Sequence, residues 1–504
     1  MCGITGFISK DRNAPIEERT ALLDRMCASI TYRGPDEQGI LVRDRAALGM
    51  RRLSIIDIKS GQQPIFSDDG NLAIVYNGEI YNFRELRKEL ESLGHKFKTN
   101  SDTEVIVNAF EEFGPDCVHK LRGMFAFAEF DLKRRILRLA RDRFGIKPLY
   151  YRMASDRWVF GSEVKAILAA RGVSRNPNPK AIGEFLWFGN PTGAETAFAG
   201  IQKLLPGTAL ELSPDGSKTF SFWTPGDVAG ADVEWTEAVI GTRERLDDAV
   251  RTHLVSDVPI GVFLSGGVDS SALTAFAARR TGRPLQTFSV GFDDRRHADE
   301  TDAARRVASQ FGTDHHEIRV SGVASRDVIP RLVRAHDEPF ADAANIPLFM
   351  LAEQLAGSVK VVLQGDGGDE VFGGYRRHRI LANAAVWKAV GRMIGPLLSV
   401  VDRTERTRRA LRLCRAVGAS DLGTRMALLL TTETLADSPT AMLEAAFRES
   451  ASRHDPFEAY RESARTSACR DPVAMMLLAD LGIQLPNTFL EKVNRATMAH
   501  GIEA

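Results

Sequence analysis

Cys2 is the first residue whose type and position suggest chemistry, because it directly follows the initiator methionine. A side chain this small at position two usually allows Met1 to be removed. Cys2 would then carry a free α-amine, with a pKa of about 7.7–8.0, beside its own thiol. The thiolate attacks and the amine shuttles the proton, so the sequence predicts an N-terminal nucleophile. A disordered terminal thiol without a role is the alternative. The β-type run over residues 3–8 favours a terminus tied into a sheet.

Attack on an amide carbonyl requires hydrogen-bond donors where negative charge develops, and Asn77 and Gly78 are candidates. The side chain of Asn77 and the backbone N–H of Gly78 can supply them, since glycine allows close approach of the backbone to a substrate. A type I′ hairpin turn is the alternative for the same dipeptide. An amino-acid substrate would also need a cation for its carboxylate and an anion for its ammonium group. Arg52 and Asp102 are the candidates for these two roles.

A second kind of chemistry is indicated by Ser265-Gly266-Gly267-Val268-Asp269-Ser270-Ser271, which follows an apolar run over residues 257–264. A strand, a glycine-rich turn and a helix N-terminus together bind anions such as phosphate. No lysine follows the glycines, so this is not a Walker A loop. N–H groups, serine hydroxyls and a metal bound by Asp269 would then hold the terminal phosphates, which suits release of pyrophosphate as a unit. A plain strand–helix turn is the alternative.

A second glycine-rich loop follows the apolar run over residues 359–363 and carries Asp366, Asp369 and Glu370. Three carboxylates beside a phosphate loop suggest Mg²⁺ coordination and acid–base work. A solvated acidic turn is the alternative. Both loops follow strands, so in a parallel sheet they can face one crevice.

The elements that must position these residues differ between the two halves. Up to about residue 212, short β-rich runs alternate with turn signals and a few helices, which predicts an α+β unit of packed sheets covered by helices. The predicted strands are 39–42, 53–58, 72–76, 124–131, 136–141, 149–152, 158–162 and 209–212, and the predicted helices are 15–29, 83–93, 102–113 and 163–170. Further on, helices at 236–254, 272–280 and 299–311 alternate with strands at 257–264, 284–291 and 359–363, which predicts an α/β fold with a parallel sheet.

Composition argues against several classes of protein. The 504 residues contain 66 basic and 66 acidic side chains, so net charge gives no reason to bind nucleic acid or an anionic membrane. The five cysteines are too few and too scattered for a disulfide framework, and no CxxC pair suggests zinc. The most apolar stretch, residues 384–401, is interrupted by Lys388, Arg392 and Pro396. The N-terminus lacks the pattern of a secretory signal, so we expect a cytoplasmic protein.

The motifs of the first half resemble a known family. MCGITGF, RGPD, RLSIID, NGEIYN, SDTEV, GMFAFA, RDRFGIKPLYY and FGSEVKAIL resemble, in order, the N-terminal glutaminase of class II glutamine amidotransferases, specifically that of the glutamine-hydrolysing asparagine synthetases. The resemblance implies the N-terminal-nucleophile αββα fold, with Cys2 as nucleophile and Asn77 and Gly78 as the oxyanion hole. It also implies that glutamine is held by Arg52, Leu53, Ser54, Ile55, Ile56, Asn77, Gly78, Glu79 and Asp102.

The second half extends the resemblance. LSGGVDSS, TFSVGF, GTDHHE, DEP and GDGGDEVFGGY resemble the synthetase domain of the same family, an adenine-nucleotide α-hydrolase-like fold. That implies activation of aspartate by ATP to β-aspartyl-AMP, with ammonia arriving from Cys2 through an internal channel. The residues implied to bind ATP are Leu264, Ser265, Gly266, Gly267, Asp269, Ser270, Val290, Gln364 and Gly365, and those implied to hold Mg²⁺ are Asp269 and Asp369. His315 and His316 lack partners at metal-ligand spacing, so we interpret them as structural or surface residues.

The sequence departs from the family pattern in two places. Asp366 stands where the family often has the glutamate that assists adenylate formation, so the carboxylate is one methylene shorter. Residues 487–504 match a late motif that the family continues with Arg-x-Pro-Phe-Leu-Asp, which predicts a truncated C-terminus. Lys492 and Arg495 in this motif are candidate pyrophosphate contacts.

The predicted organisation is a glutaminase at residues 1–212, a linker at 213–235 and a synthetase domain at 236–504. The expected partners are the small molecules glutamine, aspartate and ATP, with no nucleic acid and no membrane, and a homodimer is left open. Two alternatives stay open: amidation of another carboxylate, such as a sugar acid or a peptide, and a non-catalytic scaffold.

Overall fold

The computed structural model describes residues 2–9, 14–213, 216–227, 233–282, 284–292, 300–320, 325–400, 404–432 and 438–504. Met1 lies outside the described residues, and so does Asp299, the first residue of the predicted helix over 299–311. We call the part up to Ser221 the N-terminal domain and the part from Trp235 the C-terminal domain.

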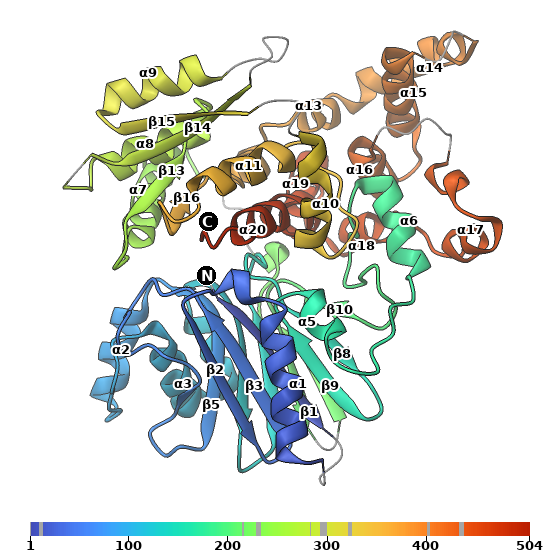
Figure 1. Ribbon diagram of the computed structural model, residues 1–504. Coiled ribbons are helices and arrows are strands. Elements are labelled where there is room, and N and C mark those ends of the chain that lie inside the picture. The colour runs from blue at the N-terminus through green and yellow to red at the C-terminus, as the bar shows by residue number, and fades with distance from the viewer. Residues whose placement is uncertain are drawn as a thin grey trace.

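The N-terminal domain contains two antiparallel sheets of six strands each, stacked face to face. The first runs β10 (Gln202–Lys203), β8 (Tyr150–Met153), β9 (Arg157–Gly161), β1 (Gly3–Ser9), β3 (Ala46–Arg52) and β2 (Glu37–Arg43). The second runs β12 (Gly216–Ser221), β11 (Thr208–Ser213), β7 (Ile136–Arg141), β6 (Gly123–Asp131), β5 (Leu72–Ile80) and β4 (Ile65–Phe66). Helices cover both outer faces (Figure 1): α1 (Ile16–Ala28) and α5 (Val164–Leu168) on the first, α2 (Phe83–Ser92) and α3 (Asp102–Phe113) on the second. These layers are the predicted αββα sandwich.

Alternating side chains explain why β1 lies in the centre of its sheet. Ile4 and Ile8 point into the core between the sheets, whereas Phe7 packs beneath α1. β1 pairs with β3 on one side and β9 on the other, so the chain next to Cys2 is held on both edges. The prediction that the N-terminal run is tied into a sheet is confirmed.

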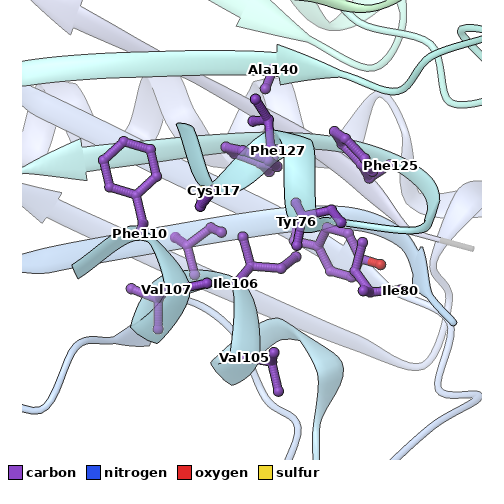
Figure 2. Close-up of a cluster of buried hydrophobic side chains, with 14 of the residues drawn as sticks. Tyr76, Ile80, Val105, Ile106, Val107, Phe110, Cys117, Phe125, Phe127 and Ala140 are labelled. Carbon is purple, nitrogen blue, oxygen red and sulfur yellow. The ribbon is translucent and has the colours of Figure 1, made fainter. Parts of the chain in front are cut away.

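The outer face of the second sheet packs on α3 through a large apolar cluster (Figure 2). Ile106 and Phe110 of α3 and Phe127 of β6 are among its buried members. The cap of α3 is the hydroxyl of Ser101, which accepts a hydrogen bond from the backbone nitrogen of Thr103. This packing fixes the first turn of α3, where Asp102 lies.

The C-terminal domain is built on a parallel sheet of four strands in the order β15 (Asp314–Val320), β14 (Gln286–Phe292), β13 (Ile260–Phe263) and β16 (Val361–Leu363). Val262 faces α7 (Trp235–His253) and α8 (Val268–Ala278), whereas Phe263 and Phe288 face α10 (Ser325–His336) and α11 (Asn345–Leu355). The predicted parallel sheet with helices on both faces is therefore confirmed. α9 (Thr301–Phe311) packs against Leu264, at the end of β13.

The rest of the C-terminal domain is helical. Its helices are α12 (Gly368–Phe372), α13 (Arg376–Ala382), α14 (Ala384–Val400), α15 (Glu405–Gly418), α16 (Leu422–Leu430), α17 (Ala445–Ser452), α18 (Glu458–Thr466), α19 (Pro472–Ala479), a π-helix (Asp480–Phe489) and α20 (Leu490–Met498). α20 lies where the two domains meet (Figure 1). The run from Pro472 to Met498 is long and apolar enough to cross a membrane by length and composition alone, a test that core helices also pass, and Met476 and Ala496 in it are buried in apolar clusters.

Two sequence expectations were wrong, and one alternative reading is excluded. Residues 53–58 form a loop, because β3 covers Ala46–Arg52 and ends just before them. β12 lies within the predicted linker, where polar side chains such as Lys218 hide a short strand at the edge of the sheet. Asn77 and Gly78 lie in the middle of β5, paired with β6, so they form no hairpin turn.

Candidate active sites

Cys2 lines a pocket of about 450 Å³ at the start of β1. Its Sγ lies 3.9 Å from the carbonyl oxygen of Leu53, to which the thiol donates a weak hydrogen bond. Burial raises the pKa of this thiol, and the bond to Leu53 and the nearby charge of Arg52 oppose that shift. A thiol with a raised pKa needs a base close by to become a nucleophile. The α-amine of Cys2, free once Met1 is removed, is such a base.

Asn77 contacts Cys2 directly. Its Oδ1 accepts a hydrogen bond of 3.1 Å from the backbone nitrogen of Cys2. Its Nδ2 is buried and has no hydrogen-bond partner among the described residues. A buried donor without an acceptor costs about 1–3 kcal/mol, a cost that a substrate oxygen bound there would remove. Gly78 lines the same pocket, and a Cβ at this position would lie 2.1 Å from the carbonyl oxygen of Met124, so only glycine fits.

The loop over residues 53–57 forms one wall of the pocket through Leu53, Ile55 and Ile56. Arg52 also lines the pocket, and its guanidinium donates to Glu37 and to the carbonyl oxygens of Ile56 (3.1 Å) and Asp57 (2.7 Å). Arg52 thus holds the loop as well as bordering the pocket. Ser54 is not among the residues that line the pocket.

The backbone of this loop is fixed from both domains. Ser54 donates its backbone N–H to Asp36 (2.9 Å), whose carboxylate also pairs with Lys360 of the C-terminal domain (2.8 Å). The backbone N–H of Asp57 donates to Asp257 (2.9 Å). The wall of the Cys2 pocket therefore rests partly on the C-terminal domain.

Carboxyl groups of Glu79, Asp102 and Glu503 line the same pocket. Asp102 accepts hydrogen bonds from the hydroxyl of Tyr76 (2.9 Å) and the backbone nitrogen of Ile80 (3.0 Å). Burial raises the pKa of Asp102, and these hydrogen bonds oppose the shift. Burial, with the charges of Asp102 and Glu503, raises the pKa of Glu79 well above its usual range. An ammonium group bound here would relieve that repulsion.

A second pocket, of about 870 Å³, lies at the ends of β13 and β16 and beside the middle of β14. Of the predicted nucleotide-binding residues, its lining includes Leu264, Ser265, Gly267, Asp269, Ser270, Val290, Gln364 and Gly365, and Asp366 joins them. Gly266 lies behind this lining with φ +80°, where a Cβ would come within 2.6 Å of Ala303. This glycine therefore allows the turn to pack against α9.

Hydroxyl groups hold the turn in place. Ser265 and Ser270 share a hydrogen bond of 3.0 Å between their Oγ atoms, and the backbone nitrogen of Gly267 donates to Ser265 Oγ (3.2 Å). α8 then begins at Val268, which brings its N-terminal N–H groups to the pocket. The helix starts four residues earlier than the predicted 272.

Asp269, which lines this pocket, lies close to the carboxylate of Asp369, which is not among the lining residues. Burial and the charge of Asp369 raise the pKa of Asp269. A Cβ on Gly368 would lie 2.4 Å from Asp269 Oδ2, so the second loop touches this carboxylate. Among the described residues, no group of three or more His, Cys, Asp and Glu side chains could hold a metal by itself.

Asp366 accepts a hydrogen bond of 2.7 Å from the side-chain nitrogen of Gln364. Removal from bulk water raises the pKa of Asp366; the Lys492 ammonium opposes this shift, and Glu370 and Asp342 add to it. The Nζ of Lys492 lies 3.5 Å from Asp342. The charge of Lys492 therefore acts on Asp366, but Lys492 is not among the residues that line the nucleotide pocket, and its contact with pyrophosphate stays a prediction.

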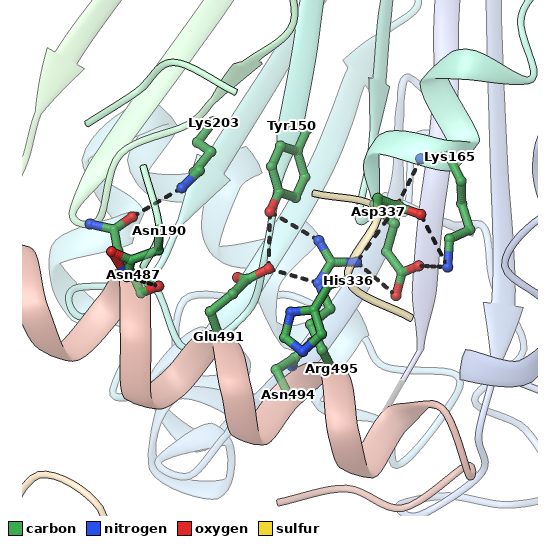
Figure 3. A network of polar contacts seen from close by, with 12 residues as sticks. Tyr150, Lys165, Asn190, Lys203, His336, Asp337, Asn487, Glu491, Asn494 and Arg495 are labelled. Atoms are coloured by element: carbon green, nitrogen blue, oxygen red, sulfur yellow. Dashed lines mark hydrogen bonds and ion pairs between the residues drawn. The ribbon is translucent and has the colours of Figure 1, made fainter. Parts of the chain in front are cut away.

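Arg495 lies elsewhere. It is fully buried between the domains, where its guanidinium pairs with Glu163 (3.1 Å) and Glu491 (2.7 Å) and donates to the hydroxyl of Tyr150 (2.9 Å) (Figure 3). It does not line the nucleotide pocket. The prediction that Arg495 contacts pyrophosphate disagrees with this position, because these partners already occupy the guanidinium.

A third cavity, of about 830 Å³, lies between the two pockets. Glu79 and Glu503 line both this connecting cavity and the Cys2 pocket. Gln364 and Asp366 line both the connecting cavity and the nucleotide pocket. Each candidate site therefore shares wall residues with this cavity, which connects the two sites.

Sequence reasoning missed several residues of these cavities. Glu503, Tyr81 and His253 come from separate segments and meet only in the fold. Glu503 forms a buried ion pair with Lys147, 356 residues away. One feature of the sequence could have indicated this ion pair. Lys147 lies among apolar residues just before Pro148, and a buried lysine nearly always has a partner of opposite charge.

Comparison with known proteins agrees with this architecture. Residues 1–223 match the model of the glutamine amidotransferase domain, and residues 241–504 match the asparagine synthase model. A pocket with an N-terminal cysteine between two sheets, joined to a nucleotide-type pocket on a parallel sheet, defines a two-domain glutamine amidotransferase. More narrowly, the chain belongs to the asparagine synthase family.

Its relatives carry matching names. Glutamine-hydrolysing asparagine synthetase 1 of Bacillus subtilis (strain 168) is 37% identical over 379 residues, which are 75% of this chain and 60% of that protein. The putative asparagine synthetase 2 of Methanocaldococcus jannaschii is 34% identical over 402 residues, 75% of this chain and 76% of that protein. The chain spans about three-fifths of the length of the Bacillus relative. Among solved structures, glutamine phosphoribosylpyrophosphate amidotransferase from B. subtilis has 17% identity and a TM-score of 0.34 over 63% of this chain and 81% of that chain, too slight a likeness to carry an argument.

Proposed function

We propose that this chain is a glutamine-dependent asparagine synthetase. It hydrolyses glutamine at Cys2 and forms β-aspartyl-AMP from ATP and aspartate. Ammonia then joins the two reactions, giving asparagine, AMP, diphosphate and glutamate. The observation that carries the proposal is the connecting cavity, whose walls are shared with the Cys2 pocket through Glu79 and Glu503 and with the nucleotide pocket through Gln364 and Asp366.

In the glutaminase half, the Cys2 thiolate attacks the side-chain carbonyl carbon of glutamine. The resulting oxyanion accepts hydrogen bonds from Asn77 Nδ2 and Gly78 N–H, and ammonia leaves with a proton from the α-amine. Water then hydrolyses the thioester to glutamate. Asp102 and Glu79 favour the substrate ammonium group, and Arg52 its carboxylate. The unpartnered Nδ2 of Asn77 supports this role for the oxyanion donor.

In the synthetase half, an aspartate side-chain carboxylate attacks the α-phosphorus of ATP, and pyrophosphate leaves. The turn at Ser265 and Gly267 and the start of α8 would hold phosphate oxygens. Lys492 would neutralise the departing charge, and Asp366 would assist adenylate formation. Ammonia then attacks the activated carbonyl carbon and AMP leaves.

Mg²⁺ fits beside this turn. Asp269 and Asp369 are close enough for their charges to interact, and two carboxylates completed by phosphate oxygens are a usual ligand set for Mg²⁺. The ion would shield the charge of the phosphates. Without it, Asp269 and Asp369 would repel the nucleotide.

We further propose that the protein works in the cytoplasm on these small molecules, without nucleic acid or membrane partners. The five cysteines are all free thiols, which suits a reducing compartment. Whether the protein is a homodimer is tested by light scattering.

The experiment that tests the proposal follows nitrogen from glutamine to product. Protein incubated with amide-¹⁵N glutamine, ATP, Mg²⁺ and aspartate is expected to give asparagine labelled in its amide. Pyrophosphate release is measured with aspartate and with a panel of other carboxylates, including sugar acids and peptides. Release that is independent of aspartate would overturn the proposal.

The matched variant is Cys2→Ala. It is expected to lose glutamine use and to keep synthesis from added ammonium chloride. Loss of both reactions in a folded variant would contradict two separable sites. A folded wild-type chain that turns over neither substrate would be a scaffold.

A further inference from the structure

The connecting cavity has mostly apolar walls, supplied by residues such as Met124, Ile146 and Val493. The lining also includes polar residues, and in these buried surroundings each polar group needs a partner. Tyr81 and His253 are two of these polar residues, and they come from different domains.

Tyr81 and His253 contact each other across the domain boundary. Tyr81 follows β5, and His253 is the last residue of α7. Their ring centroids are 3.9 Å apart, with an angle of 34° between the ring planes. The backbone nitrogen of Tyr81 donates to the carbonyl oxygen of Arg122 (2.8 Å), which fixes the tyrosine. The pair is therefore a built feature of the cavity wall.

The hydrogen bonds of His253 determine where its proton lies. Nδ1 is 2.7 Å from the carbonyl oxygen of Ala249. A carbonyl oxygen only accepts, so Nδ1 carries the proton and Nε2 of the neutral ring has a free lone pair. The hydroxyl of Tyr81, by contrast, is buried and has no hydrogen-bond partner among the described residues.

The charges around the pair keep both rings neutral. Burial lowers the pKa of His253, and Arg122 and Lys147 lower it further, although the bond to Ala249 opposes them. Burial raises the pKa of Tyr81 well above its usual range, as do Glu79 and Glu503. A neutral acceptor and a neutral donor thus stand side by side in a cavity whose other polar lining residues are Glu79, Gln364, Asp366, Asn494 and Glu503.

We propose that Tyr81 and His253 form a binding station for ammonia in the connecting cavity. An N–H of ammonia donates to His253 Nε2, and the Tyr81 hydroxyl donates to the ammonia lone pair. Ammonia is small and both donates and accepts, so it satisfies both groups at once. The inference deepens the proposed function and rests on it, because ammonia reaches this cavity only if Cys2 releases it.

At the far end of the cavity, Gln364 extends the path toward the activated acceptor. Its Oε1 is buried without a partner among the described residues, whereas its nitrogen donates to Asp366. Oε1 can take an N–H of ammonia that has left the Tyr81–His253 station.

Two substitutions of His253 distinguish the role of the Nε2 acceptor from the role of the aromatic ring. His253→Phe keeps an aromatic ring against Tyr81 and removes the acceptor. His253→Gln restores an acceptor oxygen near the position of Nε2. With amide-¹⁵N glutamine, we expect His253→Phe to lower the ratio of labelled asparagine to glutamate by about three- to tenfold, the effect of losing one hydrogen bond. His253→Gln is expected to retain that ratio within about twofold, and all three proteins should hydrolyse glutamine at similar rates.

A second measurement detects the station without any chemistry. Protein labelled with ¹⁵N-histidine is titrated with ammonium chloride at pH 9, where a substantial part is neutral ammonia. We expect the Nε2 resonance of His253, identified by its absence in His253→Phe, to shift, and Tyr81→Phe to reduce the shift.

The outcomes distinguish the two proposals. Wild-type protein that transfers no glutamine nitrogen, yet shows the Nε2 shift, would overturn the proposed function and leave the station. Wild-type transfer together with an unchanged ratio in His253→Phe and no Nε2 shift would overturn the station and leave the proposed function.

Discussion

The backbone nitrogen of Cys2 donates a hydrogen bond of 3.1 Å to the side-chain oxygen of Asn77, 75 residues further along the chain. The contact joins the start of β1 in one sheet to the middle of β5 in the other. Once Met1 is removed, it holds the α-amine itself. One amide side chain then positions the base through its oxygen and offers its nitrogen to the oxyanion.

Asn77→Asp keeps the oxygen that Cys2 contacts and loses the NH₂ group. Because one oxyanion donor is lost, we expect kcat for glutamine hydrolysis to fall by about 10²–10³-fold. Glutamate release measures this. Pyrophosphate release with ammonium chloride is the internal control and is expected to stay unchanged. A variant with a kcat close to that of the wild type would show that Asn77 does not donate to the oxyanion.

Removal of Mg²⁺ with EDTA is expected to stop pyrophosphate release and to leave glutamine hydrolysis in place, because the proposed ligands Asp269 and Asp369 lie at the nucleotide pocket. Asp269→Asn is expected to raise the Mg²⁺ concentration for half-maximal release by about tenfold or more, since a charge-assisted contact is lost. Equal Mg²⁺ dependence in the variant and the wild type would exclude Asp269 as a ligand.

Arg495→Met breaks the buried ion pairs with Glu163 and Glu491 and leaves Glu491 without its cation, whereas Glu163 keeps its ion pairs with Arg33 and Lys165. We expect a loss of about 3–5 kcal/mol of stability, measured by urea denaturation. The control is Arg453→Met, where the ion pair with Glu449 is exposed and contributes at most about 1 kcal/mol. Equal losses in the two variants would contradict a structural role for the interdomain network.

His336 is expected to make the protein sensitive to acid. Its Nε2 accepts a hydrogen bond of 2.7 Å from Asn345, and its ring stacks on Phe340. Burial, with Arg495 adding to it, lowers the pKa of His336 to about 4, whereas Glu491 and Glu163 act the other way. In the unfolded chain the pKa is about 6.5.

Because the folded pKa is the lower one, the unfolded state binds more protons between these two values. The stability contribution is present above pH ~6.5 and is lost as the pH falls toward about 4. Between pH 7 and pH 5 we expect His336 to account for a loss of about 2 kcal/mol. Urea denaturation of His336→Gln at both pH values should show a smaller loss than wild type, and the exposed control His454→Gln should show the same loss as wild type. Identical pH dependence in wild type and His336→Gln would exclude this contribution.

The predictions from sequence were most accurate for helices and strands that short-range patterns determine. The run after Cys2 alternates apolar residues and does form a central strand, and the predicted helix at 102–113 has the observed bounds. The strand predicted at 53–58 failed because its apolar residues serve as a pocket wall and a contact with the C-terminal domain. Leu53 and Ile55 pack against Val361 there.

Long-range partners could not be read from the sequence. Asn77-Gly78 has the composition of a turn, yet pairing with β6 keeps it extended. Arg495 lies in a motif that suggested a phosphate contact, but Glu163, Glu491 and Tyr150 bind it inside the domain junction. Nothing local in the sequence distinguishes these outcomes, because each depends on residues far along the chain.

The location of the interdomain contacts has a consequence for building hybrid enzymes. Asn494 of α20 accepts a hydrogen bond of 3.0 Å from Arg33, which also donates to the carbonyl oxygen of Cys2. Glu503 pairs with Lys147. A hybrid spliced once, between Ser221 and Trp235, would join an N-terminal domain to a foreign docking surface supplied by residues 491–503. Exchange of glutaminases between relatives would therefore need a second splice that carries this short segment along with the domain that it binds.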